Sequence, residues 1–138
     1  MTFEDLKLHN SLQKAVKDQN YETPTSIQAK TIPLILDRND VLSTAQTGTG
    51  KTAAFSLPIL HHLENESQNQ GKRKVKALIV TPTRELAIQI AENFTDYSKY
   101  NSIKNTVIYG GVKQIKQVKR LDAGVDVLIA TPGRLLDL

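Results

Sequence analysis

The chain has 138 residues, of which 39% are hydrophobic and 23% charged, a balance typical of one globular domain and not of a disordered segment. It contains no cysteine, which excludes a disulfide framework and a cysteine-based zinc site, and its three histidines do not resemble a metal-binding motif. The formal net charge of +4 is compatible with a polyanionic partner, and no apolar stretch is long enough to span a membrane, so we expect a cytoplasmic protein.

The first third of the chain is predicted to contain two helices and a short strand. The first helix is expected over about 10–20. Thr25 and Gln28 have the spacing of a capping box, in which each side chain bonds to the other residue's backbone, so a second helix is predicted to begin there. Residues 40–43, Asp-Val-Leu-Ser, are predicted to form a short buried strand.

The rest of the sequence alternates between strands and helices. Helices are expected over about 51–63, 84–99 and 113–121 and from about 134, and strands over 77–80, 106–108 and 126–130. Strands that are apolar on both faces, between amphipathic helices, indicate an α/β fold with a parallel sheet flanked by helices. The handedness of such crossovers places every strand-to-helix junction at one edge of the sheet. We expect one domain over 1–138, with a helical region over 1–36 and an α/β core over 40–138.

The first junction has the composition of a phosphate-binding loop. It consists of Ala45, Gln46, Thr47, Gly48, Thr49, Gly50, Lys51 and Thr52. Glycines let the backbone N–H groups turn toward phosphate oxygens, and the helix N-terminus adds partial positive charge. The lysine can reach the β- and γ-phosphates of ATP, and the threonine hydroxyl can bind Mg²⁺. The usual pattern has glycine where Ala45 stands, but a strand before, a helix after and an intact Gly-Lys-Thr make a chance loop improbable.

Two further junctions share the pattern Thr-Pro-x-Arg. They lie at 81–84 and 131–134, and each places an arginine in the first turn of a helix, where a cation is disfavoured by about 0.3–1 kcal/mol. A bound polyanion would explain the repetition, although an ion pair between Arg84 and Glu85 is a competing explanation for the first. Gly110 and Gly111 end another strand, where they form a turn or admit a nucleic-acid backbone.

These motifs, in this order, resemble the N-terminal RecA-like domain of DEAD-box RNA helicases. The matching sequences are A-x-T-G-T-G-K-T at 45–52, P-T-R-E-L-A at 82–87, G-G at 110–111 and T-P-G-R at 131–134. Alanine at the start of the phosphate loop is typical of that family. Residues 21–28, Tyr-Glu-Thr-Pro-Thr-Ser-Ile-Gln, resemble its Q motif, with Phe3 at the upstream aromatic position. Residues 135–138 are similar to the bacterial RhlE-like branch.

The resemblance implies the ATP- and RNA-binding part of an ATP-dependent helicase that locally unwinds RNA duplexes. Gln28 would hydrogen-bond adenine and Phe3 would stack on it. The alternative role of Gln28 is the capping box, which needs the same amide; the resemblance favours adenine. Contacts to the backbone of single-stranded or duplex RNA, which are salt-sensitive, would come from Pro82, Thr83, Arg84, Gly110, Gly111, Thr131, Pro132, Gly133 and Arg134.

The 138 residues contain no Asp-Glu-Ala-Asp sequence, which in the family holds Mg²⁺ and orients the attacking water, and no second RecA-like domain. We therefore expect the chain alone to lack ATPase and helicase activity, and the strand at 40–43 to lose neighbours, which would favour self-association. Two alternatives stay open. One is a stand-alone nucleotide- or RNA-binding module; the other is a P-loop NTPase acting on something else, which would leave the Thr-Pro-x-Arg junctions unexplained.

Overall fold

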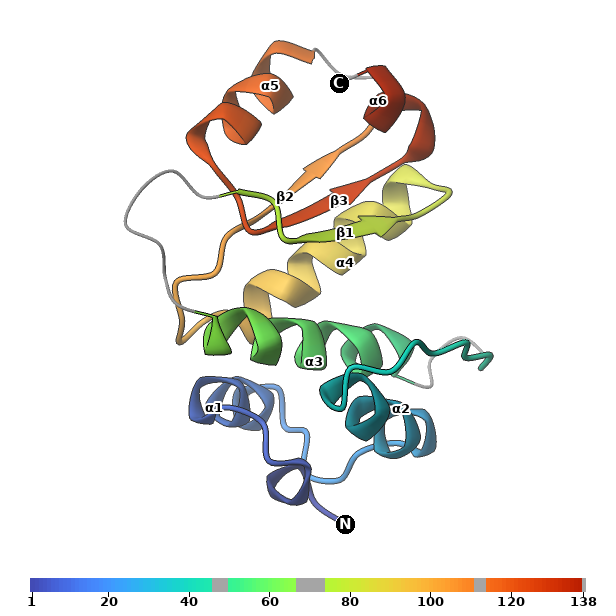
Figure 1. Cartoon of the computed structure of the whole chain (residues 1–138), viewed down its shortest axis with the longest axis vertical. Helices are drawn as coiled ribbons and strands as arrows, with labels where there is room; N and C mark the ends of the chain where they lie inside the picture. Colours follow the sequence, from blue (N-terminus) through green and yellow to red (C-terminus); the bar gives the residue numbers. More distant parts are fainter. Residues whose placement is uncertain (46–49, 67–73, 111–113, 138) are drawn as a thin grey trace. The chain divides into compact units, whose positions relative to one another are not determined.

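The computed structural model describes residues 1–45, 50–66, 74–110 and 114–137 (Figure 1). They belong to two compact units, a helical unit (Met1–Glu66 and Asp96–Ser102) and a sheet unit (Ser67–Thr95 and Ile103–Leu138). The elements in chain order are η1 (Phe3–Leu6), α1 (Asn10–Asp18), α2 (Ser26–Leu36), α3 (Lys51–Asn65), β1 (Ala77–Val80), α4 (Arg84–Tyr97), β2 (Asn105–Ile108), α5 (Gln114–Ala123), β3 (Val127–Ala130) and α6 (Pro132–Asp137). The predicted helices and the three strands after residue 76 are confirmed to within a few residues.

The helical unit packs α1 and α2 against α3. α1 buries Leu12 and Val16, and α3 buries Leu57 and Leu60. α2 begins at the predicted capping box: the Thr25 hydroxyl oxygen accepts from the residue 28 backbone N–H at 3.4 Å, while Thr25 N–H donates to the side-chain amide oxygen of Gln28 at 3.0 Å. This box fixes the first turn of α2 because it supplies partners to backbone groups that a helix end leaves unsatisfied.

The strand predicted at 40–43 is not formed. Its backbone is irregular, and Val41 is 37% and Leu42 97% exposed. A strand is stable only when a neighbour completes its backbone hydrogen bonds. Among the described residues, the strands that pair are β1, β2 and β3, and none of them takes 40–43 as a partner. The apolar run at 41–42 is therefore solvent-exposed here, as expected for a segment without sheet neighbours.

The sheet unit has three parallel strands in the order β1-β3-β2, which confirms the predicted α/β fold. All four residues of β3 are buried, as in a central strand covered on both faces. Figure 1 shows α4 and α5 on opposite sides of the strands. Ile108, Leu128 and Ala130 form a buried apolar cluster, and Leu121 of α5 packs against it.

The orientation of α5 differs from its apolar pattern. Ile115 and Val118, which lie three residues apart on one face of the helix, are 66% and 38% exposed. The helix instead buries Gln117, which is 5% exposed. The hydrogen bonds of this amide, described below, account for the difference.

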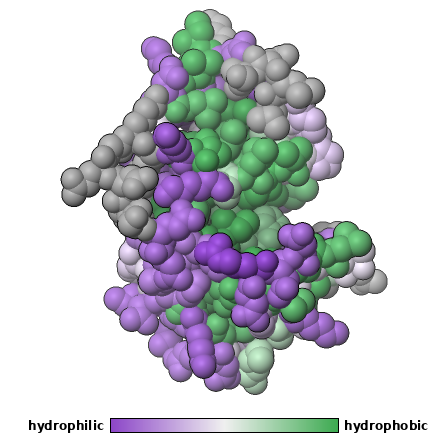
Figure 2. Space-filling model, in the orientation of Figure 1, coloured by the Kyte–Doolittle hydropathy of each residue, from purple (hydrophilic) through white to green (hydrophobic). Residues whose placement is uncertain are grey.

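Apolar surface is also exposed on β1, where Leu78 and Val80 are 52% and 53% exposed. Figure 2 shows apolar surface where Figure 1 places this strand. Among the described helices, none combines the length and the hydropathy needed to cross a bilayer.

Candidate functional site

The start of α3 carries the described part of the predicted phosphate loop. Gly50 is the N-cap residue, with φ of 86°, and Lys51 and Thr52 open the first turn. Lys51 is exposed, and its ammonium Nζ donates to the Ala45 carbonyl oxygen at 2.6 Å. An anion at this helix end would meet the lysine charge and the positive end of the helix dipole. Gln46, Thr47, Gly48 and Thr49 lie outside the described residues.

Gln28 lies directly against Gly50. Its side chain is 4% exposed, and the amide Nε2 donates to the Gly50 carbonyl oxygen at 3.2 Å. A Cβ placed on Gly50 would be 2.3 Å from that nitrogen. Glycine is therefore required here twice, by the left-handed backbone and by the close amide. The structure thus joins the Q-motif glutamine to the phosphate loop.

Phe3, the other residue expected at adenine, is 3% exposed. Its ring stacks on that of Tyr21, with centroids 6.1 Å apart and planes 25° apart, and its N–H donates to the Glu22 carbonyl oxygen at 3.3 Å. Phe3 therefore packs against the Q-motif segment. Its stacking on adenine stays a prediction, since the ring has little exposed surface.

The other predicted junctions meet at one edge of the sheet unit. Val80 and Ile108 both align with Ala130 in the parallel register, so all three strands end at the same level. The chain then continues into 81–84, 109–110 and 131–134. Thr81 N–H donates to the Ala130 carbonyl oxygen at 3.0 Å, and Thr131 N–H donates to the Ile108 carbonyl oxygen at 3.1 Å. Three of the segments predicted to bind RNA are therefore neighbours.

Arg84 projects from the first of these segments. The Thr83 hydroxyl caps α4 by accepting from Leu86 N–H at 3.2 Å, which places Arg84 in the first turn. The ion pair with Glu85 is present but weak: the atoms are 4.0 Å apart and the side chains are 51% and 77% exposed. The guanidinium carbon also lies 5.7 Å from the ring centroid of Tyr109, a cation–π contact. Most of the arginine charge stays accessible to an anion.

Gly110 and Gly133 have open surroundings. A Cβ on either residue would have no neighbouring atom within 4 Å. Neither is among the glycines with positive φ, which are Gly50 and Gly124 among the described residues. Internal packing and backbone conformation therefore leave room for a side chain at both positions. Pro82 and Pro132 are exposed, and Gly111 lies outside the described residues.

Two residues of this edge were not among the predicted site residues. Tyr109 lies between β2 and Gly110, and Gln117 hydrogen-bonds to its carbonyl oxygen at 3.0 Å and to the Arg134 guanidinium at 3.3 Å. Tyr109 sits directly before the glycine pair, a position that sequence alone marks as a junction. Gln117 carries no such signal, because a glutamine on a polar helix reads as solvent-exposed.

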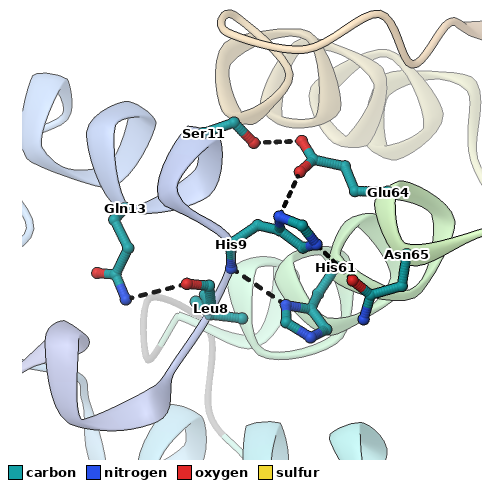
Figure 3. Close-up of polar contacts among 7 residues, drawn as sticks. All are labelled: Leu8, His9, Ser11, Gln13, His61, Glu64 and Asn65. Carbon is teal, nitrogen blue, oxygen red and sulfur yellow. Dashed lines mark hydrogen bonds and ion pairs between the residues drawn. The ribbon is translucent and has the colours of Figure 1, made fainter.

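The helical unit also contains a polar cluster between α1 and α3 (Figure 3). His9 Nδ1 lies 3.1 Å from a Glu64 carboxylate oxygen, and the Ser11 hydroxyl donates to the other oxygen of Glu64. His9 Nε2 contacts the side-chain oxygen of Asn65. Ser11 bonds to the carboxylate and not to an imidazole, so the serine–histidine–acid order of a hydrolase triad is not formed. The cluster ties the beginning of α1 to the end of α3.

His61 completes this cluster by accepting the His9 backbone N–H at Nδ1, at 3.1 Å. The bond needs an unprotonated Nδ1, so it favours the neutral ring. Burial, followed by the nearby charges of His9 and His62, lowers the pKa of His61, and the Glu64 carboxylate partly opposes the shift. The neutral form is therefore the structural form of this histidine.

The described residues include no group of three or more histidine, cysteine or acidic side chains placed to hold a metal ion. Thr52 offers one half-buried hydroxyl at the start of α3. Mg²⁺ bound with a nucleotide needs few protein ligands, since phosphate oxygens and water complete its six positions. The residues present fit a nucleotide-borne Mg²⁺ better than a resident metal.

Comparison with known proteins agrees with these motifs. Residues 25–138 match the family described as DEAD/DEAH box helicase. The chain is 45% identical over 137 residues to the ATP-dependent RNA helicase CshA of Limosilactobacillus reuteri, covering 99% of this chain and 27% of the relative. It is 47% identical over 137 residues to the ATP-dependent RNA helicase DeaD of Klebsiella pneumoniae, covering 99% and 20%.

A solved structure, that of a hypothetical ATP-dependent RNA helicase from Sulfolobus tokodaii, has a TM-score of 0.83 and 39% identity, covering 95% of this chain and 36% of that one. The chain thus spans about a quarter of the length of the relatives above, 27% and 20%.

Proposed function

The chain belongs to the DEAD/DEAH box helicase family, and from this premise we propose that it is the ATP- and RNA-binding part of an ATP-dependent RNA helicase. Lys51 binds the β- and γ-phosphates, Thr52 holds the accompanying Mg²⁺, and Gln28 and Phe3 receive the adenine. Bound Mg²⁺ neutralises phosphate charge. When the nucleotide binds, the lysine ammonium exchanges the Ala45 carbonyl oxygen for a phosphate oxygen, which forms a stronger, charge-assisted hydrogen bond.

One observation carries the RNA-binding half of the proposal: the convergence of 81–84, 109–110 and 131–134 at one sheet edge. This edge presents the exposed Arg84, and no contact among the described residues requires glycine at positions 110 and 133. A sugar–phosphate backbone approaches such glycines closely, and the arginine neutralises its charge. Recognition of this kind holds the strand without reading its sequence.

RNA binding is tested with a fluorescently labelled single-stranded RNA at several salt concentrations. Arg84→Ala and Arg134→Ala are each expected to weaken binding and to reduce the salt slope by about one, since each removes one phosphate contact. Arg120→Ala is the matched control, because Arg120 is an exposed arginine in the last turn of α5. Equal affinities for parent and both edge variants contradict the proposal.

Nucleotide binding is tested by displacement of a fluorescent ADP. Lys51→Ala and Gln28→Ala should both lose specific binding, whereas Lys30→Ala, which removes an exposed lysine from α2, should retain it. Equal binding by Lys51→Ala and the parent contradicts the site. We further propose that these 138 residues alone do not hydrolyse ATP; turnover above that of Lys51→Ala contradicts this.

The unpaired segment at 41–42 leads to a related proposal about assembly. Val41 and Leu42 line an open groove of about 610 Å³ with Leu34 of α2. Its apolar surface, and a backbone with which no described strand pairs, favour self-association of the isolated chain. Sedimentation of the parent and of Leu42→Lys tests this: the variant should be more nearly monomeric, and equal behaviour at equal concentration contradicts the proposal.

A further inference from the structure

Gln117 is buried on α5, although the amphipathic pattern of a helix would place an apolar residue at a buried position. It is 5% exposed, while Ile115 and Val118 on the same helix are 66% and 38% exposed. Burying an amide costs free energy unless its polar atoms find partners. Both ends of this amide are bonded, so the buried face of the helix combines a polar side chain with the apolar Leu121.

The two partners of Gln117 belong to different junctions of the sheet edge. Its Nε2 donates to the Tyr109 carbonyl oxygen at 3.0 Å, immediately before Gly110. Its Oε1 accepts from Arg134 Nη1 at 3.3 Å, in the segment after β3. The Tyr109 ring in turn lies 5.7 Å from the Arg84 guanidinium carbon of the third junction. One buried side chain thus links the segments that are proposed to bind RNA.

We propose that Gln117 is a positioning residue for RNA-backbone binding, which fixes the Arg134 guanidinium relative to the backbone at Tyr109 and Gly110. This inference rests on the proposed RNA-binding function of the sheet edge. Holding the two groups in place before RNA arrives lowers the ordering cost of binding. An amide suits this role because it donates to a carbonyl and accepts from a guanidinium at once. A carboxylate cannot donate, and an aliphatic side chain does neither.

The test measures RNA affinity by anisotropy of a labelled 20-nucleotide single-stranded RNA, with the 138-residue chain, over a range of KCl concentrations. Gln117→Met keeps length and apolar stem but loses both bonds. It should weaken binding roughly tenfold, the usual effect of losing hydrogen bonds to a charged group, and reduce the salt slope by up to about one. Gln89→Leu removes an exposed glutamine from α4 and should change neither value.

Circular dichroism and thermal unfolding establish that each variant folds. If Gln117→Met is unfolded, Gln117→Glu gives the result instead. It keeps an acceptor for Arg134 and loses the donor to Tyr109, so its RNA affinity should fall between those of parent and Arg134→Ala. Parent-like affinity in the folded variant overturns the inference.

A double-mutant cycle separates positioning from a general structural effect. If Gln117 acts largely through Arg134, then Gln117→Met should weaken binding much less in the Arg134→Ala background than in the parent. Independent, multiplicative effects overturn the inference. If Arg84→Ala and Arg134→Ala bind RNA like the parent, the proposed function fails and the inference falls with it. If those variants bind weakly and Gln117→Met does not, the inference alone is wrong.

Discussion

The contact between Gly50 and Gln28 gives a sharp prediction about stability. Gly50→Ala would place a Cβ 2.3 Å from the Gln28 amide nitrogen and 3.1 Å from the Thr25 hydroxyl oxygen, at a residue whose φ is +86°. The nearest atom is the end of a flexible side chain, so the amide has to retreat. Its retreat breaks the bonds to Gly50 and to Thr25 N–H.

The expected cost follows from these losses. An alanine in the left-handed region costs about 1–2 kcal/mol. Each of the two hydrogen bonds is worth about 0.5–1.5 kcal/mol. The free energy of unfolding should therefore fall by about 2–5 kcal/mol, the sum of the backbone and hydrogen-bond costs.

Urea denaturation followed by circular dichroism measures this change. In a Gln28→Ala background the clash is absent, so Gly50→Ala should cost only the backbone share of about 1–2 kcal/mol. Gly133→Ala is the matched control: it lies in α6, has open surroundings and should be neutral or stabilising by up to about 1 kcal/mol. Equal costs of Gly50→Ala in both backgrounds, or a cost below about 0.5 kcal/mol in the parent, would refute the reasoning.

Three further predictions concern stability. Because the folded state lowers the pKa of His61, the unfolded chain binds more protons at acid pH. The contribution of His61 to stability should therefore be complete above about pH 6.5 and decrease as the pH falls below it. Thermal unfolding between about pH 7.5 and 5.5 should show a smaller decrease in melting temperature for His61→Asn than for the parent. Thr25→Ala should lower the free energy of unfolding by about 0.5–2 kcal/mol in urea, because α2 loses its cap. Leu42→Ala should change the free energy of unfolding by less than about 0.5 kcal/mol, because Leu42 is 97% exposed, whereas Leu57→Ala should lower it by about 2–5 kcal/mol, because Leu57 is 0% exposed. Similar changes for the two variants would contradict this prediction.

The helices and strands that were predicted correctly are those whose local sequence pattern, such as a helix cap or an apolar run, is supported by tertiary contacts. The capping box starts α2 at the expected residue, and the apolar strands pair in a parallel sheet with their ends in register. The segment at 40–43 has an apolar pair, Val41 and Leu42, but a strand also needs a neighbour, which no local pattern can supply. Leu42 is exposed for that reason.

Hydrophobic periodicity alone does not identify the buried face of α5, because it treats every polar residue as solvent-exposed. Two hydrogen-bond partners outweigh that tendency for Gln117. Tyr109 precedes Gln117 by 8 residues and Arg134 follows it by 17, both outside α5, so the pattern of apolar and polar residues within the helix does not reveal either partner. The same limit applies to Tyr109, whose ring contact with Arg84 joins two junctions.

The side-chain amide of Gln28 has enough hydrogen-bonding positions for both of its expected roles, the α2 cap and the binding of adenine. A side-chain amide accepts two hydrogen bonds and donates two. In the described chain the cap uses one acceptor position and the Gly50 carbonyl oxygen uses one N–H. One donor and one acceptor remain, which is the pair that an adenine edge requires. The amide is 4% exposed, so on the proposed function adenine needs access to the amide rather than more bonding capacity. We therefore expect the proposed nucleotide binding to shift the segments around the amide and to leave the α2 cap intact.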